Sequence, residues 1–372
     1  MGLILNDLKN ACELEHVCDY VNNRTTSSMN YISTENMLPN KGGISESTII
    51  PPGTTTEYKI GDILISNIRP YFQKIWCADR CGGCSADVLC IRAKENTDSK
   101  YLYYLLSQQA FFDYVMSGAK GCKMPRGDKK QIMQWPVNIP AIDVQKKVVA
   151  ILSSLDNKIR LNRRINDNLE EQAKALFKSW FVDFEPFKGG KFVDSKLGPI
   201  PEGWSIGKVN DVVQILSGFA FKSETFVQSG PYRLITIKGV QDGYLDISGA
   251  SYISKVPLKM PAYCNLEIGD ILLSLTGNVG RVCIVDRPNL LLNQRVAKLQ
   301  PRRDKQDLLF VYILFRQDTF KNHLLQIARG TAQLNLSPVE TREISIILPP
   351  ANVLLEFSKI GQYLFDKIAL SN

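Results

Sequence analysis

The sequence contains only two histidines, His16 and His323, which lie far apart along the chain. Catalytic or metal sites that need paired histidines are therefore disfavoured. The longest uninterrupted apolar run, residues 308–315, is far shorter than the roughly 18 residues that a membrane-spanning helix needs. No basic segment followed by an apolar one opens the sequence, so we expect neither a secretory leader nor a membrane partner.

The motifs of two enzyme classes are also missing. The sequence has no Gly-x-x-x-x-Gly-Lys-Ser/Thr loop, which disfavours nucleotide hydrolysis by that route. It also lacks the Asn/Asp-Pro-Pro-Tyr/Phe element of amino-directed DNA methyltransferases, because residues 348–351 offer neither the amide nor the aromatic side chain. We therefore expect a chain without catalytic residues and without a cofactor.

The composition is that of an ordinary globular protein. The 372 residues predict two or three domains at about 150 residues per domain. Lys and Arg number 45 against 37 Asp and Glu, so the net charge is +8, which is compatible with a polyanionic partner without requiring one. The nine cysteines are an odd number in a chain without a leader, so we expect reduced thiols and a cytoplasmic location.

A repeat is present in the sequence. Residues 60–66, Ile-Gly-Asp-Ile-Leu-Ile-Ser, recur at 268–274 as Ile-Gly-Asp-Ile-Leu-Leu-Ser, and matches at offsets of 208 or 209 continue to Tyr104 with Tyr312 and Pro140 with Pro349. This register predicts two copies of one unit. Each copy is expected to contain short strands between Gly, Pro and Asn turns, one helical stretch (101–116 or 308–326) and a closing strand that ends in proline. The fold class is α/β (α+β).

The repeat also provides a control for a cluster of cysteines. Cys77, Cys81, Cys84 and Cys90 lie within 14 residues, and the gap between the second and third is that of a zinc ligand pair. The corresponding residues of the second copy are Val285, Asn289, Leu292 and Lys298, which are not thiolate ligands. We expect free thiols and no metal, with a zinc site as the less favoured alternative.

A heptad pattern follows the first copy. Its positions, at spacings of three and four residues, are Val148, Leu152, Leu155, Ile159, Asn162, Asn166, Leu169, Ala173, Leu176 and Trp180. The pattern predicts a coiled-coil helix roughly 60 Å long; a helix lying on a globular surface is the alternative. A similar pattern from about Asn352 to the end is half as long. Beside the seam are four candidate partner-docking residues, Leu161, Ile165, Phe177 and Phe181, unless these pack onto the globular domains.

Polar and basic loops supply the candidate contacts to nucleic acid. A glycine-rich basic loop at 118–130 can approach phosphates, and its counterpart at 329–335 carries the Arg, Gln and Asn side chains that read base edges. Each candidate also has an ordinary interpretation as a turn or surface residue. In the first copy they are Asn67, Arg69, Tyr71, Lys74, Lys120, Lys123, Arg126 and Lys129; in the second they are Thr276, Asn278, Arg281, Gln294, Arg295, Arg329, Gln333 and Asn335.

Together these features resemble the specificity subunit of type I restriction-modification systems. The resemblance rests on the duplicated Gly-Asp block, the Pro-x-x-x-Val-Gln run at 140–145, the long segment 151–187 and the Leu-Gly-Pro-Ile-Pro-Glu-Gly-Trp sequence at 197–204. It implies two similar target-recognition domains with pseudo-two-fold symmetry, separated by long antiparallel coiled-coil helices. Each domain would read one half of a split sequence in double-stranded DNA. Two methylation subunits would bind the helices, and motor-nuclease subunits would join through them.

On this basis we expect recognition domains at 1–140 and 188–349, a central spacer helix at 141–187 and a short C-terminal spacer helix at 350–372. Three departures limit the transfer: the final helix is short, Gln145 has Leu354 as its counterpart, and no base-contacting residue is defined by a family motif. Two other functions remain open. They are a coiled-coil scaffold without DNA specificity and a single-chain DNA-modifying enzyme.

Overall fold

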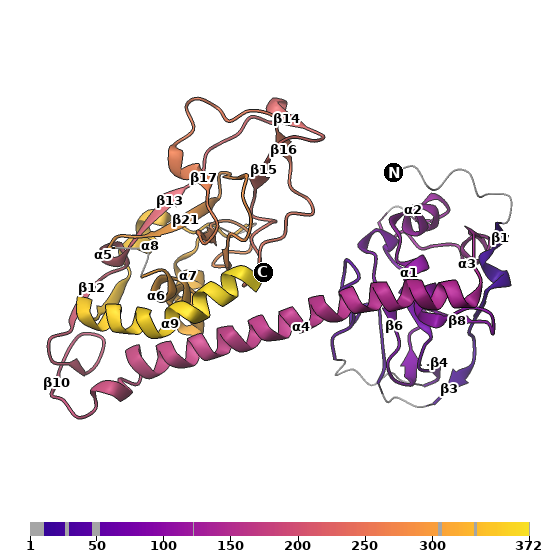
Figure 1. Ribbon diagram of the computed structural model, residues 1–372, viewed down its shortest axis with the longest axis horizontal. Coiled ribbons are helices and arrows are strands. Elements are labelled where there is room, and N and C mark those ends of the chain that lie inside the picture. Colours follow the sequence, from indigo (N-terminus) through magenta and orange to yellow (C-terminus); the bar gives the residue numbers. More distant parts are fainter. Residues whose placement is uncertain are drawn as a thin grey trace. The chain divides into compact units, whose positions relative to one another are not determined.

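A computed structural model describes residues 11–26, 30–46, 53–121, 123–303, 307–330 and 333–371. The chain divides into two compact units, 1–157 and 158–372, and the boundary falls inside the long helix α4 (Ile142–Phe181). Figure 1 labels the elements. The first unit contains β1 (Cys12–Glu13), β2 (Cys18–Tyr20), β3 (Arg24–Thr25), β4 (Thr55–Tyr58), β5 (Ile63–Ser66), β6 (Ile75–Cys77), β7 (Gly82–Cys84), β8 (Val88–Ala93), β9 (Pro136–Val137), α1 (Ser99–Leu106), α2 (Gln109–Ser117), α3 (Lys129–Met133) and the 3₁₀ turns Leu14–His16 and Pro70–Phe72.

The second unit repeats most of these elements and has several more. Its helices are α5 (Val209–Val212), α6 (Leu308–Arg316), α7 (Asp318–Ile327), α8 (Pro338–Arg342) and α9 (Ala351–Ser371), with 3₁₀ turns at Glu185–Phe187, Ser223–Thr225 and Ala262–Cys264. Its strands are β10 (Phe192–Val193), β11 (Ile200–Pro201), β12 (Ser205–Lys208), β13 (Val213–Ser217), β14 (Phe226–Val227), β15 (Tyr232–Ile235), β16 (Tyr252–Ile253), β17 (Asn265–Leu266), β18 (Ile271–Ser274), β19 (Val282–Ile284), β20 (Leu290–Leu292), β21 (Val296–Pro301) and β22 (Ser345–Leu348).

The two units share one sheet topology, which confirms the repeat. A four-stranded antiparallel sheet has the order β2-β8-β5-β6 in the first unit and β13-β21-β18-β19 in the second. Within it Ile63 pairs with Ile91, and Ile271 pairs with Leu299, so both partners are displaced by 208 residues. The second sheet of each unit also matches, because the β4–β7 pair of the first unit corresponds to the β17–β20 pair of the second. In the second unit this sheet also carries β14, β15 and β16.

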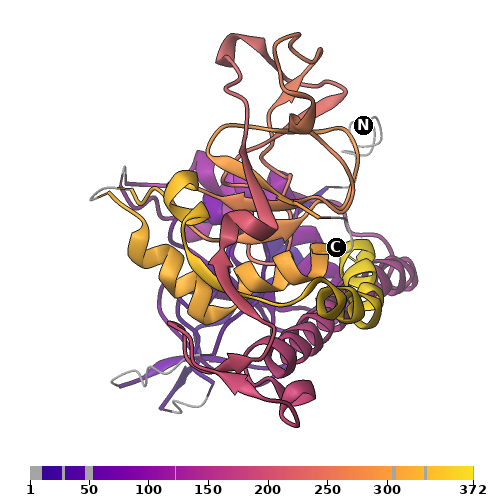
Figure 2. The same cartoon turned by 90° about the vertical axis from the view of Figure 1, so that its left-hand side faces the viewer.

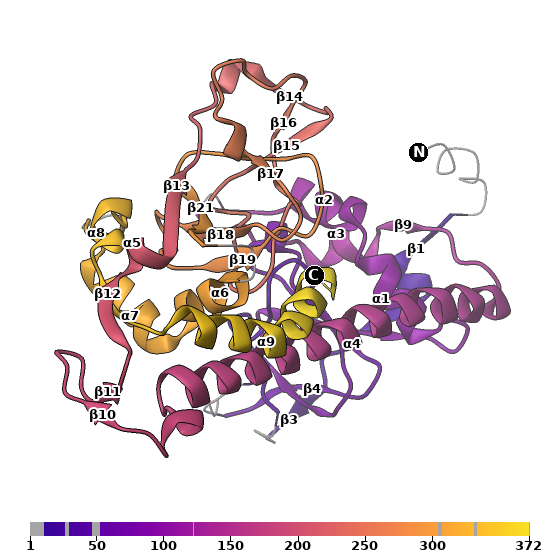
Figure 3. The ribbon, with the colours of Figure 1, turned by 60° about the vertical axis from the view of Figure 1, so that its left-hand side comes forward.

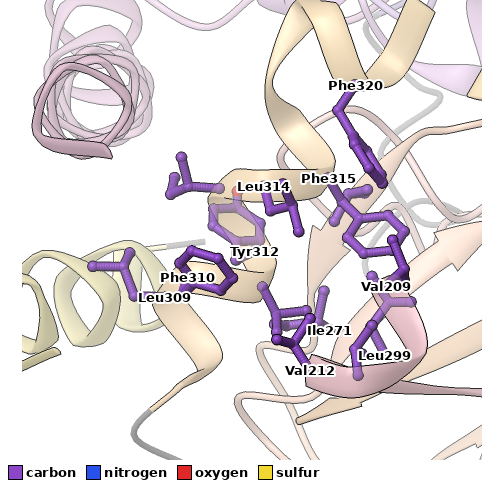
Figure 4. Close-up of a cluster of buried hydrophobic side chains, with 14 of the residues drawn as sticks. Val209, Val212, Ile271, Leu299, Leu309, Phe310, Tyr312, Leu314, Phe315 and Phe320 are labelled. Carbon is purple, nitrogen blue, oxygen red and sulfur yellow. The ribbon is translucent and has the colours of Figure 1, made fainter. Parts of the chain in front are cut away.

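Alternation along the central strand builds two layers of core. In β5, Ile63 and Ile65 belong to the cluster that includes residues of α1 and α2, whereas Leu64 packs into the cluster around Tyr58 and Trp76. β18 repeats this alternation, because side chains two residues apart lie on the same face of a strand. Figure 4 shows the helix-facing cluster of the second unit, where α6 lies over side chains from β18, β21 and α5.

The helical stretch expected in each copy is two helices. Gln108 and Gln317 have extended backbone, with ψ of 147° and 133°, so α1 is separated from α2 and α6 from α7. The helical pattern continues across both breaks, which is why the sequence does not reveal them. No helix among the described residues is long and apolar enough to cross a bilayer.

The predicted long helix is confirmed, and α9 pairs with its C-terminal half. In Figures 1 and 3 α9 runs antiparallel to this half of α4, and the two also lie together in the end-on view of Figure 2. The Phe357 ring lies 4.7 Å from that of Phe181 and 6.3 Å from that of Phe177. The N-terminal half of α4 differs, since Ile151 and Leu155 on its seam are 64% and 53% exposed.

The docking role predicted for two of the four residues is wrong. Phe177 and Phe181 are buried, because both α9 and α6 cover this part of α4. The buried stripe of α4 is therefore wider than the seam of a two-helix pair. The Phe310 ring of α6 lies 5.4 Å from Phe177 and 5.0 Å from Phe181. Leu161 and Ile165 are exposed, so their docking role stays a prediction.

Candidate nucleic-acid interface

The repeated Gly-Asp turn leads into the central strand of each unit. Gly61 and Gly269 have φ of +89° and +92°, a conformation that glycine adopts without steric cost. The carboxylates of Asp62 and Asp270 close the two turns by accepting a hydrogen bond from the amide three residues earlier, at 2.8 and 2.9 Å. The turns therefore fix β5 and β18, whose C-terminal ends carry the candidate loops.

The first loop pair consists of residues 67–74, which follow β5, and residues 120–126. Backbone hydrogen bonds join the two loops: the Arg69 amide donates to the Pro125 carbonyl at 2.8 Å, and the Gly127 amide donates to the Asn67 carbonyl at 3.2 Å. Lys120 and Arg126 each donate a backbone hydrogen bond to the other, which closes the loop at residues 120–126. Residues that are about 50 positions apart in sequence thus form one surface.

The second loop pair, residues 275–281 and 329–335, has the same backbone arrangement. The Gly277 amide donates to the Leu334 carbonyl at 2.9 Å, the Leu336 amide donates to the Leu275 carbonyl at 2.7 Å, and residues 329 and 335 exchange both backbone hydrogen bonds. Every one of these bonds has its counterpart in the first loop pair at an offset of 208 or 209. The fold therefore holds both loop pairs in one geometry and leaves their side chains to differ.

A third segment joins each loop pair. The Leu275 amide donates to the Arg295 carbonyl, and the Asn67 amide donates to the Asp87 carbonyl, both at 2.9 Å. The second unit thus brings Arg295, and Gln294 beside it, to the second loop pair. Asp87 is the corresponding residue of the first unit and is absent from the sequence-based candidates. Extending the offset of 208 to residue 295 would have found it.

Most of the candidates present their side chains to solvent. Asn67 and Thr276 do not: they are 3% and 5% exposed, so as direct contacts to nucleic acid both predictions are wrong. Asn67 follows β5 directly and Thr276 follows β18 after one residue; both strands are buried on their two faces, and this burial extends to them. The exposed candidates are Arg69, Tyr71, Lys120, Lys123, Arg126, Lys129, Asn278, Gln294, Arg295, Arg329, Gln333 and Asn335.

Two other candidates, and the exposed Lys129, are held by neighbouring groups. Lys74 is half-buried and donates to the Thr34 carbonyl at 2.7 Å, and burial lowers the pKa of its ammonium group. The Arg281 guanidinium donates to the Gln241 side chain at 2.5 Å. Lys129 donates to the Tyr20 hydroxyl at 2.6 Å. No signal in the sequence points to Gln241, because the matches at the offset of 208 do not extend to the segment that carries it.

Acidic side chains hold several of the cations in place. Asp87 binds Arg126 at 2.5 Å, Asp128 binds Lys120 at 3.4 Å and Glu340 binds Arg329 at 2.5 Å. Hydrogen bonds from the amides of residues 130 and 131, and then from Lys120, lower the pKa of the Asp128 carboxyl. The Arg295 guanidinium makes no hydrogen bond or ion pair with another described residue.

The four clustered cysteines show no zinc-site geometry. Burial raises the pKa of the Cys77 thiol to about 11 and that of Cys84 to about 12, and it raises the pKa of Cys90 as well. Without a metal, thiols with such pKa values stay protonated at neutral pH. In the described part of the chain, no three of these cysteines bring their sulfur atoms within 4.8 Å of one another.

Comparison with known proteins decides the family. The family model described as "Type I restriction modification DNA specificity domain" matches this chain twice, over residues 9–171 and 201–371. The chain belongs to this family. The two matches also agree with the internal repeat, and the family confirms the resemblance drawn from the sequence.

Relatives within the family are specificity subunits of type I restriction enzymes. The chain is 28% identical to the MjaIX subunit of Methanocaldococcus jannaschii, over 74% of this chain and 64% of that one. It is 30% identical to the MjaVIII subunit of the same organism, over 68% of this chain and 60% of that one. Both alignments thus span less than two thirds of the relatives' own length. With the HindI subunit of Haemophilus influenzae it shares 26% identity over 92% of this chain and 89% of that one.

A solved structure supports the fold. The crystal structure of a type I restriction-modification S subunit from M. genitalium aligns with 99% of this chain and 92% of its own, with a TM-score of 0.51 and 15% identity. This likeness agrees with two similar α+β units and long helices.

Proposed function

We propose that this chain is the DNA-recognition subunit of a type I restriction-modification complex. The first loop pair contacts one half of a bipartite target in double-stranded DNA, and the second loop pair contacts the other half. The observation that carries the proposal is the shared backbone of the two loop pairs, which supports different side chains: Lys and Arg dominate in the first, and Arg, Gln and Asn in the second.

The chemistry of these side chains fits base and phosphate contacts. Arginine binds guanine bidentately, and Asn or Gln binds adenine, whereas lysines neutralise phosphates without reading sequence. Arg295 fits a base contact best, since its guanidinium is exposed and makes no other described interaction. Arg126 is held by Asp87, which reduces its freedom and fixes its direction.

We further propose the division of labour along the chain. Residues 1–140 and 188–349 act as recognition domains, and 141–187 and 350–372 act as spacer helices that set the distance between the half-sites. Two methylation subunits dock on the helices, for which the exposed Leu161 and Ile165 are candidates, and motor-nuclease subunits join through them. The chain itself contributes no catalytic residue and needs no cofactor.

The test is reconstitution with the methylation subunits of the same host. We expect the complex to bind one methylated sequence, identified by methylome sequencing, at least a thousandfold more tightly than unrelated DNA at physiological salt, within the range usual for specific binders. The isolated chain is expected to transfer no methyl groups. Equal affinity for all sequences would favour a scaffold, and methyl transfer by the chain alone would favour a DNA-modifying enzyme.

A further inference from the structure

The first loop pair presents two aromatic rings to solvent. Tyr71 and Phe72 are 49% and 38% exposed, and their ring centroids lie 4.7 Å apart. The corresponding turn of the second unit is one residue shorter: Ser66 and Lys74 share a backbone hydrogen bond around the first turn, and Ser274 and Arg281 share one around the second. The second turn has no aromatic side chain, and its Val279 is buried.

Rigid backbone supports this aromatic pair from both sides. The Phe72 carbonyl accepts a hydrogen bond from the Asn40 amide at 2.8 Å, and the Gln73 carbonyl accepts one from the Lys41 amide at 3.0 Å. On the other side, the Arg69 amide donates to residue 125 of the neighbouring loop. The pair therefore stands on a fixed base and does not need to be ordered when a ligand binds.

The backbone on each side of the pair is strained. Arg69 and Gln73 adopt the left-handed conformation, with φ of 51° and 52°, which side-chain-bearing residues rarely take. Such strain persists where surrounding contacts hold it, and it concentrates at binding sites. Here the strained turn carries two large aromatic side chains that stay 49% and 38% exposed.

One cation lies near the rings, and three more are on the same two loops. Lys74 Nζ lies 5.9 Å from the centre of the Phe72 ring, and Arg69, Lys123 and Arg126 are exposed on the same two loops. Exposed aromatic rings in a basic setting match nucleic acid, because nucleobases stack on aromatic side chains while the phosphates bind cations. An acidic or apolar protein surface would satisfy only one of these two features.

We infer that Tyr71 and Phe72 form an apolar wedge that enters the DNA at a base step of the half-site contacted by the first loop pair. The wedge unstacks that step, and the second loop pair has no equivalent. This inference rests on the proposed function and adds an unequal action of the two units: one deforms its half-site, and the other reads an undeformed one.

The test uses the complex reconstituted with its methylation subunits and target duplexes that carry 2-aminopurine at single positions outside the methylated adenines. With the unchanged chain, we expect fluorescence to rise at one step of one half-site only. The double variant Tyr71→Ala/Phe72→Ala is expected to lose this signal and about 10- to 100-fold in affinity for the target. Phe192→Ala, which removes an exposed ring of β10 outside both loop pairs and both spacer helices, serves as the matched control and is expected to keep both.

The outcomes separate the possible failures. If the double variant binds the target as tightly as the unchanged complex does, the wedge is overturned and the proposed function stands. The same conclusion follows if the double variant binds more weakly but no base step unstacks in the unchanged complex. Loss of complex formation, with an unaltered unfolding midpoint of the free chain, assigns the rings to a protein partner and also overturns the wedge. Absence of any sequence preference in the unchanged complex refutes the proposed function itself.

Discussion

The two loop pairs share their backbone hydrogen bonds and differ in charge at matching positions. In the first pair, Asp87 neutralises Arg126. In the second pair, Arg295 takes the position of Asp87 and Asn335 that of Arg126, so the cation is at the other position and makes no ion pair with a described residue. Neither change disturbs the hydrogen bonds that hold the loops. The comparison shows that the fold separates positioning, which backbone groups supply, from recognition, which the side chains supply.

The units also differ in the ion pairs that they make with α4. In the second unit Arg316 is nearly buried and pairs with Glu170 of α4 and with Asp242, while the corresponding residue of the first unit is the exposed Gln108. Burial raises the pKa of Tyr312 well above its ordinary value, so its hydroxyl stays protonated and donates to Glu170 at 2.6 Å.

Arg316→Ala is therefore expected to lower the free energy of unfolding of the second unit by roughly 2–4 kcal/mol, since it leaves Glu170, whose side chain is only 13% exposed, without its counter-charge. Urea unfolding followed by tryptophan fluorescence measures the loss. The matched control Gln108→Ala is expected to change stability by less than about 0.5 kcal/mol. Equal effects of the two substitutions would remove this difference between the units.

A smaller effect is expected where the loops meet the core. Gly127 has Leu336 as its counterpart, and a Cβ at Gly127 would lie 2.8 Å from Val115 Cγ1 and 2.9 Å from Asn67 Oδ1. Gly127→Ala is expected to cost about 1–3 kcal/mol through overpacking, measured as a shift of the urea midpoint. Gly189→Ala, where no atom lies within 4 Å, is the control. A neutral Gly127→Ala would show that this junction is looser than described.

Acid is expected to affect the second unit through Asp242. Burial raises the pKa of this carboxyl, but the hydrogen bond from Lys321 and the charge of Arg316 outweigh burial, so its pKa lies below the ordinary 3.8. A lowered pKa stabilises the folded state at higher pH, and this contribution is lost as the pH falls below 3.8 through the folded-state pKa. Asp242→Asn should therefore flatten the loss of stability in that range. An unchanged acid profile would exclude Asp242 as its source.

The smallest effect is expected at Lys120, an exposed residue whose counterpart is Arg329. Lys120→Ala should leave stability within about 0.5 kcal/mol of the unchanged chain and reduce the dependence of log K on log salt by about one. Filter binding of the complex between low and physiological salt measures this slope. A change in sequence preference without a change in slope would show that Lys120 contacts a base instead of a phosphate.

The sequence predicts the parts of this fold that local patterns encode. The offset of 208 locates both central strands and matches the two loop pairs, and the heptad pattern locates α4 to within a few residues. The strands β14–β16 were not predicted, because the matches at the offset of 208 do not extend to their segment. Phe177 and Phe181 were misplaced, since a helical pattern does not show how many neighbours will cover the helix.

The sequence predicted which loops form the candidate site more accurately than which residues of these loops are exposed. Sequence patterns identify the polar and basic turns. The burial of Asn67 and Thr276 depends on β5 and β18, where burial continues beyond the apolar residues of the strand. Gln241 and Asp87 act through contacts with residues 40 and 39 positions away, and no local signal encodes such contacts.

The central claim is that matching loops address separate halves of one target. Arg126 and Asn335 occupy equivalent positions, so Arg126→Ala and Asn335→Ala form the most direct pair of variants. Each reconstituted complex is used to select from duplexes with either half-site randomised. The account predicts that each variant relaxes base preference in one half-site, a different one for each. Relaxation of the same half-site by both, or a uniform loss of affinity without any change in preference, would contradict it.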